Sequence, residues 1–442
     1  MYSSVLYSDL VTALSIRLSD PTFRFWTLNE IKAYLNEAMR TYQAYSAAYN
    51  IKAIVPTSAN TLFYDLFALV PEMAPSITDQ EIVRDVAFVL QEPYDFTLQQ
   101  WIGTEQFSQD DVFQSLNQRR NKFLLETGLV LTNIEINGPT PSTSSLVLPQ
   151  NVIDIRNMLW LESGVYSLMW RLDAHTAASK PLASLTPDSP TDYFTYPNQP
   201  QIANLIPPPA NNGKVNLLVV KSLPDLDPLT PAVLGIPDDF CWVLKYGVLA
   251  DLFGTDGPGQ DDARAAYCEK RWKEGITLAR ISNLVHLGQN AGIPTYIDSL
   301  TELNSGDPSW PSRTPGVPDF LAVAGNIIAT GPRADASYNL PIDVMPKIPI
   351  DPTGYVQFGP EVVAVILDLA QHLADLKEGA EEVQNSSRQF SNMVRLSATQ
   401  NDRLRAQAQN FDALNDRSKR FNKEHLRRVS QLGMKELDYA QE

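Results

Sequence analysis

Histidines, cysteines and paired aspartates are the residue types in this chain that could bind a metal or move protons. The two cysteines, Cys241 and Cys268, are too few for a zinc site or a disulfide scaffold. We interpret them as small buried thiols, although they could also meet across a helical hairpin. The histidines are isolated and have only surface carboxylates at helical spacing; they are His175, His286, His372 and His425. We therefore predict no metal and no cofactor.

Two aspartate pairs, at residues 238–239 and 261–262, offer the carboxylates that general acid–base catalysis requires. Both pairs stand just before a helical pattern, where the helix dipole favours negative charge, so we interpret them as helix-start signals. The sequence has no glycine-rich phosphate loop and no GxSxG, HExxH or CxxC motif. We predict that the protein is not an enzyme. A hydrolase whose fold brings an Asp/Glu pair together is the alternative.

Residues 236–280 are predicted to form a helical hairpin that organises the rest of the chain. Pro237 stands at the start of the first helix, and apolar residues recur at helical spacing from Phe240 to Leu252. A glycine-rich stretch then breaks this helix. The second helix is amphipathic, and the residues expected on its exposed faces are Lys270, Arg271, Lys273 and Glu274. By its chemistry alone, this is an ordinary bundle hairpin.

Four helices are predicted before residue 130. Leucines repeat every four positions in the first 18 residues, and capping boxes at residues 27–30 and 78–81 open the second and third helices. The fourth begins near Ser108 and ends at Gly128, which is placed as its C-cap.

The pattern then changes to strand-length apolar runs. Asn211-Asn212-Gly213 predicts a hairpin turn between the runs at residues 202–206 and 214–220. We expect residues 130–232 to be a small β-rich domain inserted between the helices.

Proline usage separates the next two segments. Eleven of the 32 prolines lie between Pro294 and Pro360, and none follows. Residues 289–360 could be disordered, but their short apolar runs favour an extended arm that becomes ordered against a partner. Residues 361–442 continue a helical pattern whose apolar stripe becomes sparse after Ala380. A long polar helix of this kind needs a partner or neighbouring copies to pack against, unless breaks near residues 385–387 shorten it.

The net charge of −16 is unevenly distributed. Residues 381–442 hold 11 Lys and Arg against 9 Asp and Glu, which leaves a net charge of −18 on the body. An acidic body repels nucleic acid, and the positive charge of the tail is too weak to indicate a nucleic-acid-binding segment. The start of the chain does not resemble a signal peptide, and no apolar run approaches the roughly 18 residues of a membrane span. We expect a protein that is cytosolic or is assembled from the cytosol, with no membrane partner.

Four stretches resemble, in the same order, the head-to-tail connector (adaptor) proteins of tailed bacteriophages. Residues 26–38 (WTLNEIKAYLNEA) resemble the family's capped first-half helix, and residues 148–156 (LPQNVIDIR) are similar to the start of its β insertion. Residues 206–217 (IPPPANNGKVNL) resemble a hairpin of that insertion. Residues 236–275 are similar to the closing helical hairpin, which is the most specific of the matches. The likeness covers roughly residues 5 to 280.

The resemblance implies a structural virion protein without catalytic residues. Its members form a homo-oligomeric ring, commonly of twelve copies, that is clamped under the portal protein and joined to the nozzle or tube proteins of the tail. DNA passes through the channel without specific binding, which agrees with an acidic body. The expected location is the neck of the virion, after assembly in the host cytoplasm. The alternatives are a virion-associated cell-wall hydrolase and a host-cell polar scaffold protein, which would have no portal partner.

Taken together, these patterns predict an α+β fold that is mainly α. A helical-bundle layer (residues 1–129 and 233–288) carries the inserted β-rich domain (130–232), an extended Pro-rich arm (289–360) and a long C-terminal helix (361–442). We expect the C-terminal segment to dock on the portal or on a neighbouring subunit through basic and apolar side chains. The residues predicted for this contact are Arg403, Arg405, Phe411, Leu414, Arg417, Lys419, Arg420, Phe421, Arg427 and Arg428.

Overall fold

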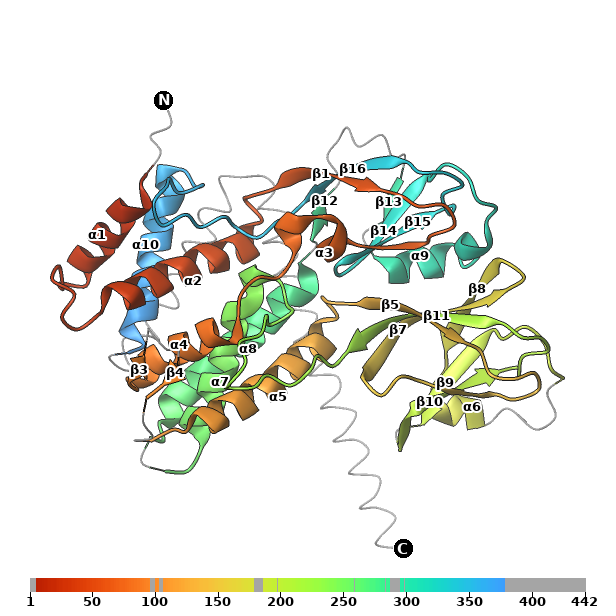
Figure 1. The fold of residues 1–442 in the computed structure, drawn as a ribbon, viewed down its shortest axis with the longest axis horizontal. Coiled ribbons are helices and arrows are strands. Elements are labelled where there is room, and N and C mark those ends of the chain that lie inside the picture. Colours follow the sequence, from red (N-terminus) through yellow and green to blue (C-terminus); the bar gives the residue numbers. More distant parts are fainter. Residues whose placement is uncertain are drawn as a thin grey trace, which may run out of the picture.

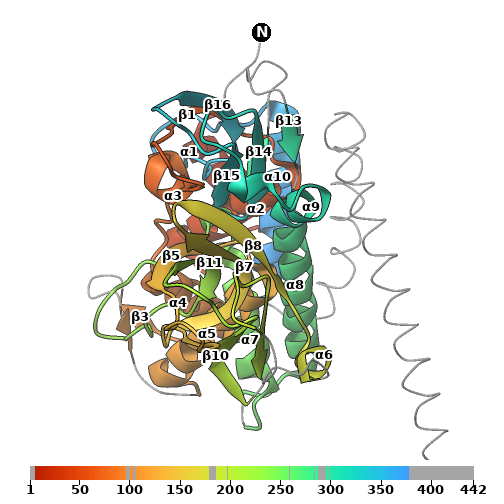
Figure 2. The same ribbon diagram turned by 90° about the vertical axis from the view of Figure 1, so that its right-hand side faces the viewer.

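The computed structural model describes residues 5–95, 100–102, 106–178, 186–196, 198–257, 259–282, 284–286, 295–297 and 299–377. A layer of helices lies beside two β regions, one above the other in the views of Figure 1 and Figure 2. In both β regions, strands that are far apart in the sequence pair with each other.

The helical layer is built around α7, in which nearly every residue is buried. This helix packs against α8, α5 and α4, while α10 packs against α1 and α2 (Figure 1). The predicted hairpin of residues 236–280 is therefore confirmed as the α7–α8 pair. The helices of the layer are α1 (Tyr7–Arg17), α2 (Leu28–Ser46), α4 (Asp79–Leu90), α5 (Gln109–Thr127), α7 (Cys241–Gly254), α8 (Asp262–Ile281) and α10 (Pro360–Asp375), with the short strands β3 (Tyr94–Asp95) and β4 (Gln100–Trp101) at its edge.

Most of the predicted helix boundaries follow from local side-chain chemistry. Thr27 and Glu30 form the expected capping box, and Ser108 forms one with Asp111. Gly128 ends α5 with a φ of 60°, a left-handed conformation that glycine adopts without strain. The capping box predicted at residues 78–81 is wrong, because the Thr78 side chain makes no capping hydrogen bond.

The lower β region is a seven-stranded sheet in the order β5-β11-β7-β8-β9-β10-β6. Its neighbouring strands are antiparallel except for β8 and β9, which are parallel. A separate apolar cluster that includes Met158, Trp160 and Leu217 fills it. The strands are β5 (Thr132–Asn137), β6 (Ser145–Val147), β7 (Val152–Glu162), β8 (Val165–Arg171), β9 (Asp192–Tyr196), β10 (Gln199–Ile206) and β11 (Lys214–Lys221), and the short helix α6 (Ala174–Ala178) lies beside β9.

The hairpin predicted between residues 202–206 and 214–220 is wrong. Strand β10 pairs with β9 and β6, whereas β11 pairs with β5 and β7. Three prolines at residues 207–209 lack the N–H groups that would extend a ladder between the two strands. The predicted turn lies instead beside residue 138, where the Gly138 N–H donates to the Gly213 carbonyl at 2.9 Å.

The upper β region contains the segment that was expected to be an extended arm. It holds two sheets, with strand orders β1-β16-β12 and β13-β14-β15-β2, so that strands from residues 51–65 pair with strands from residues 327–344. Its elements are β1 (Ile51–Pro56), β2 (Phe63–Asp65), α3 (Leu66–Leu69), β12 (Val285–His286), β13 (Thr295–Ile297), α9 (Leu300–Gly306), β14 (Phe320–Ala324), β15 (Ile327–Gly331) and β16 (Asn339–Val344). Short 3₁₀ turns lie at Pro71–Met73, Asp238–Phe240 and Trp310–Ser312.

Two parts of the predicted fold class are therefore wrong. The chain is α+β, but a seven-stranded sheet and two further β-sheets make up too much of it for a mainly helical protein. The Pro-rich segment is not an extended arm, because its short apolar runs pair with strands of the same chain and bury Trp310 in the main core. The predicted C-terminal helix is described only as α10, and the rest of it lies outside the described residues.

Candidate functional site

All ten residues predicted to contact the portal or a neighbouring subunit lie between 403 and 428, outside the described residues. The candidate site is therefore the part of the body from which that segment continues. The last described residue is Lys377, two residues after the end of α10. It lies against the connection between α1 and α2, and we call this place the α1–α2–α10 corner.

The connection from α1 to α2 is held by a single carboxylate. Asp20 accepts backbone hydrogen bonds from Arg24 (2.9 Å), Phe25 (2.7 Å) and Trp26 (3.0 Å). These amides, the one at Arg24 first, hold the pKa of the Asp20 carboxyl below its ordinary value. Since hydrogen bonds to an ionised acceptor are stronger than neutral ones, the turn that carries Phe25 is well fixed.

Lys377 is bound to the start of α2. Its Nζ donates to Glu30 Oε1 at 2.6 Å and to the Phe25 carbonyl at 3.1 Å. The other oxygen of Glu30 accepts the Thr27 N–H at 2.6 Å, so one carboxylate both caps α2 and binds the end of α10. Gln91 adds a hydrogen bond to the Lys377 carbonyl at 3.1 Å.

Apolar side chains are exposed along the same α1–α2 segment. They are Ile16, Phe25 and Leu28. The Lys377 ammonium lies 4.7 Å from the centre of the Phe25 ring, and an ion pair between Arg17 and Asp368 ties α1 to α10 nearby. The corner thus combines a fixed backbone with exposed apolar side chains on the neighbouring α1–α2 segment.

A buried ion pair lies further along α2. Lys245 on α7 pairs with Glu37 on α2, and the Tyr246 hydroxyl donates to the same carboxylate at 3.0 Å. Lys245 is only 2% exposed, so the pair is shielded from solvent. It links the N-terminal half of the helical layer to the central helix of the hairpin.

Arg271 was expected on an exposed face of α8, and this prediction is wrong. The residue is 4% exposed and lies over the rings of Trp242 and Tyr246, at 4.9 and 5.3 Å from their centres. Its Nη1 donates to Glu274 at 3.3 Å. The reason is that α8 packs against α7, α5 and α2, so its buried face is wider than that of a helix at the edge of a bundle.

One of the four histidines links two helices of the layer. The Nε2 atom of His372 on α10 lies 3.0 Å from the hydroxyl of Tyr267 on α8. Burial, together with the positive charge of Arg271, lowers the pKa of His372 to about 4. The imidazole is therefore neutral near pH 7, and it serves as a hydrogen-bonding group of the core.

Both aspartate pairs lie at helix starts, as predicted. The Asp261 carboxylate accepts the N–H groups of Ala263 and Arg264, and so caps α8. Asp238 accepts the N–H groups of Ser76 and Ile77, at 2.7 and 3.1 Å. Burial raises the pKa of its neighbour Asp239 to about 8.

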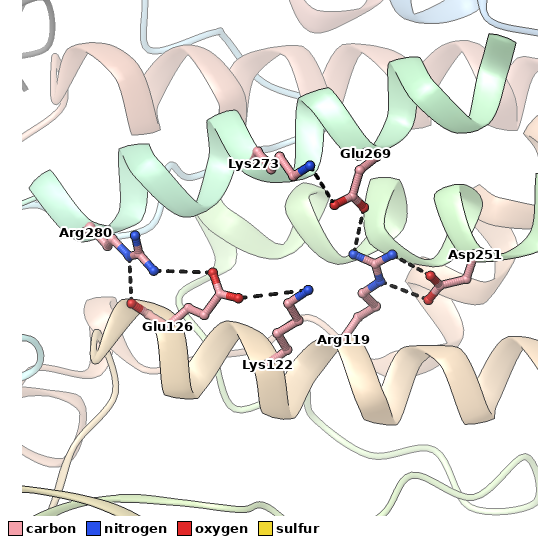
Figure 3. A network of polar contacts seen from close by, with 7 residues as sticks. All are labelled: Arg119, Lys122, Glu126, Asp251, Glu269, Lys273 and Arg280. Atoms are coloured by element: carbon pink, nitrogen blue, oxygen red, sulfur yellow. Dashed lines mark hydrogen bonds and ion pairs between the residues drawn. The ribbon is translucent and has the colours of Figure 1, made fainter. Parts of the chain in front are cut away.

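Charged residues of α5 face α7 and α8 across an ion-pair network (Figure 3). Arg119 binds Asp251 through Nε at 2.9 Å and Glu269 through Nη1 at 3.0 Å. Further along, Glu126 pairs with Arg280 at 3.3 Å. The adjacent Arg120 is fully buried and donates to the Pro224 carbonyl. Both arginines therefore act within the chain.

Within the described ranges, no group of three or more His, Cys, Asp or Glu side chains is placed to hold a metal ion. No described helix is both long and apolar enough to cross a membrane. Cys241 and Cys268 are free and buried, as predicted, and burial raises the pKa of both thiols.

No protein-family model matches this sequence, and no curated protein matches it. The likeness to head-to-tail adaptors therefore depends on the four sequence stretches and on their order.

Proposed function

We propose that the protein is a head-to-tail adaptor of a tailed bacteriophage, a structural virion protein that binds the portal and connects it to the tail. The observation that supports this proposal most is the attachment of Lys377 to the α1–α2–α10 corner. The segment that holds the ten predicted contact residues starts from a fixed point on the body, beside exposed apolar groups. An adaptor needs such a fixed point if its C-terminal segment is to reach a portal in a defined direction.

The four stretches that carry the resemblance lie at junctions of the fold. Residues 26–38 cover the cap and first turns of α2, and they include Glu30 and Glu37, which hold Lys377 and Lys245. Residues 148–156 lead into β7, residues 206–217 join β10 to β11, and residues 236–275 cover α7 and most of α8. Two of the four stretches, residues 26–38 and 236–275, therefore contain contacts that join the two halves of the helical layer.

The electrostatics also support a structural role. The body carries a net charge of −18, which favours a channel wall along which DNA slides without being held. In the part of the chain described, two buried ionisable groups of the helical layer serve packing: Lys245 is paired with Glu37, and His372 is neutral beside Tyr267.

A pull-down with the portal protein encoded by the same virus tests this proposal. A chain that ends at residue 380 keeps Lys377 and all its contacts, so it should stay folded while losing the predicted contact residues. We expect the full chain to bind the portal and the shortened chain to fail. Full-affinity binding by the shortened chain would show that the C-terminal segment is not the portal-binding element.

Charge-reversal variants test whether the predicted contact residues themselves bind the portal. Substituting Arg417→Glu, Lys419→Glu and Arg420→Glu together should weaken portal binding without changing thermal stability. The matched control is Lys270→Glu with Lys273→Glu, which reverses two exposed cations of α8. If both sets weaken binding equally, general electrostatic attraction explains the interaction and the predicted contact residues have no special part in it.

A further inference from the structure

A pocket of about 570 Å³ lies where the two β regions meet. One wall is the turn between β7 and β8, with Leu161, Val165 and Tyr166. The opposite wall is the segment after the 3₁₀ turn Trp310–Ser312, and Arg333, two residues beyond β15, completes the lining. Pockets at such junctions are common sites of ligand binding in proteins.

Arg333 is the unusual group in this pocket. The residue is 8% exposed, and its Nη2 donates to the Gly164 carbonyl at 3.0 Å. Its guanidinium carbon lies 5.0 Å from the centre of the Tyr166 ring. The Nε atom is buried without a hydrogen-bond partner, and Arg333 forms no ion pair with any residue that the structure describes.

A buried cation without a counterion is costly, because it has lost its hydration and gained little attraction in return. The second arginine of the pocket does not share this feature. Arg313 pairs with Asp307 at 2.7 Å and with Asp319 at 3.7 Å, so its charge is compensated within the chain. The pocket therefore presents one uncompensated positive charge.

The walls determine what kind of anion would fit. Leu161, Val165 and Pro315 are apolar, and the Tyr166 ring adds an aromatic surface. A ligand with one negative charge and an apolar or aromatic body would satisfy both features. The net charge of −16 on the chain opposes polyanions such as DNA.

We propose that this pocket binds a carboxylate carried on an apolar group, with the Arg333 guanidinium as its counterion. An arginine forms two parallel hydrogen bonds with a carboxylate, which gives orientation as well as affinity. The carboxylate belongs either to a small molecule or to the C-terminus of a peptide, since both offer the same chemistry. This inference does not depend on the proposed adaptor function.

Fluorine NMR on the full-length protein, with 4-fluorobenzoate as the probe, tests the proposal. We expect saturable binding of 4-fluorobenzoate and binding of the neutral 4-fluorobenzamide that is weaker by about tenfold or more. Arg333→Met should weaken benzoate binding to the same extent, while Arg280→Met, a change on α8 outside the pocket lining, should leave it intact. Equal affinity for the acid and the amide, or no saturable binding, would overturn the proposal.

A second variant protects the test in case Arg333→Met fails to fold. Val165 is half-exposed at the pocket wall, so Val165→Glu should be tolerated and should place a competing carboxylate near Arg333. We expect this variant to lose benzoate binding at an unchanged melting temperature. Retention of wild-type affinity would contradict the assigned location.

Two more ligands identify the source of the carboxylate. The peptide acetyl-Ala-Ala-Phe with a free C-terminus is compared with 4-fluorobenzoate, and phenyl phosphate is compared with both. Tighter binding of the peptide assigns the pocket to a protein C-terminus, and tighter binding of benzoate assigns it to a small carboxylate. If phenyl phosphate binds more tightly than either, the assignment of a carboxylate ligand is wrong.

Discussion

At the scale of single residues, buried ion pairs join parts of the helical layer that are far apart in the sequence. Glu37 is paired with Lys245, Glu30 with Lys377, and Asp239 lies at the start of the α7 hairpin. The partners are far apart in sequence, so no local pattern could have predicted them. The Thr27–Glu30 capping box, by contrast, was predictable because both of its residues lie within one turn of a helix.

Asp239 should make stability depend on pH. Burial raises its pKa from 3.8 to about 8, so the folded protein keeps a proton that the unfolded chain releases between these values. This contribution to stability is complete below pH 3.8 and is lost as the pH rises through about 8. The unfolding free energy of Asp239→Asn should therefore increase relative to that of the wild-type protein, by on the order of 4 kcal/mol, as the pH rises from 5 to 8.

Urea unfolding at both pH values measures this difference. Asp110→Asn, a change at an exposed position in the first turn of α5, is the matched control and should follow the wild-type protein. A constant difference between Asp239→Asn and wild type across the range would show that Asp239 is ionised in the folded state.

The Lys245–Glu37 pair gives a second prediction. Lys245→Met leaves the Glu37 carboxylate buried without its counterion, which should cost about 3–5 kcal/mol of unfolding free energy. Adding Glu37→Met should recover most of that loss, since the buried charge is then gone. Lys270→Met removes a solvent-exposed lysine of α8 and should change stability by less than about 0.5 kcal/mol. Additive effects of the two core substitutions in denaturant unfolding would disprove the coupling.

At the scale of elements, helices were more predictable than strand pairing. Caps and apolar periodicity are local, and they placed α2, α5, α7 and α8 correctly. Pairing is not local, and β10 and β11 were paired wrongly because their true partners lie elsewhere in the chain. The β14–β15 hairpin was missed although Gly325-Asn326 between two apolar runs is a two-residue hairpin signal.

Asn326, in the turn between β14 and β15, joins this hairpin to other parts of the chain. Its side chain accepts the Leu131 N–H at 2.6 Å and donates to Asp65 at 2.8 Å, and its own N–H donates to the Leu129 carbonyl. The residue is 1% exposed, so these bonds are shielded from water. It connects the upper β region to the strand that opens the seven-stranded sheet.

Asn326→Ala should therefore destabilise the junction of the two β regions. A buried N–H group and a carboxylate lose their partner, for which we expect a loss of about 3 kcal/mol in unfolding free energy. Asn133→Ala, at an exposed position of β5, should cost less than about 0.5 kcal/mol. Faster hydrogen exchange of the Leu131 amide in Asn326→Ala alone would locate the effect, and an unchanged exchange rate would contradict it.

At the scale of the whole molecule, the two ends of the described chain are interleaved. Strand β1 pairs with β16, β2 pairs with β15, and α10 packs against α2. One apolar cluster accordingly contains Leu14, Trp310 and Leu373. The resemblance to adaptors covers only residues 5 to 280, but the later strands and α10 complete the core of that part.

A chain that ends at residue 280 should consequently not fold cooperatively. It lacks the partners of β1 and β2 and exposes the face of α2 that α10 covers. The chain ending at residue 380 keeps all of these elements and should unfold near the wild-type melting temperature. Circular dichroism during thermal unfolding separates the two cases. A sharp transition in the 1–280 chain would show that this part folds without the later strands and α10.

The most direct test of the adaptor proposal is mass photometry of the purified full-length chain, alone and with the portal protein encoded by the same virus. The proposal predicts a monomer of 49.2 kDa when the chain is alone. With portal, it predicts a complex whose added mass corresponds to a closed ring, commonly of twelve copies. A chain that remains monomeric beside an intact portal ring at micromolar concentration would contradict the proposal.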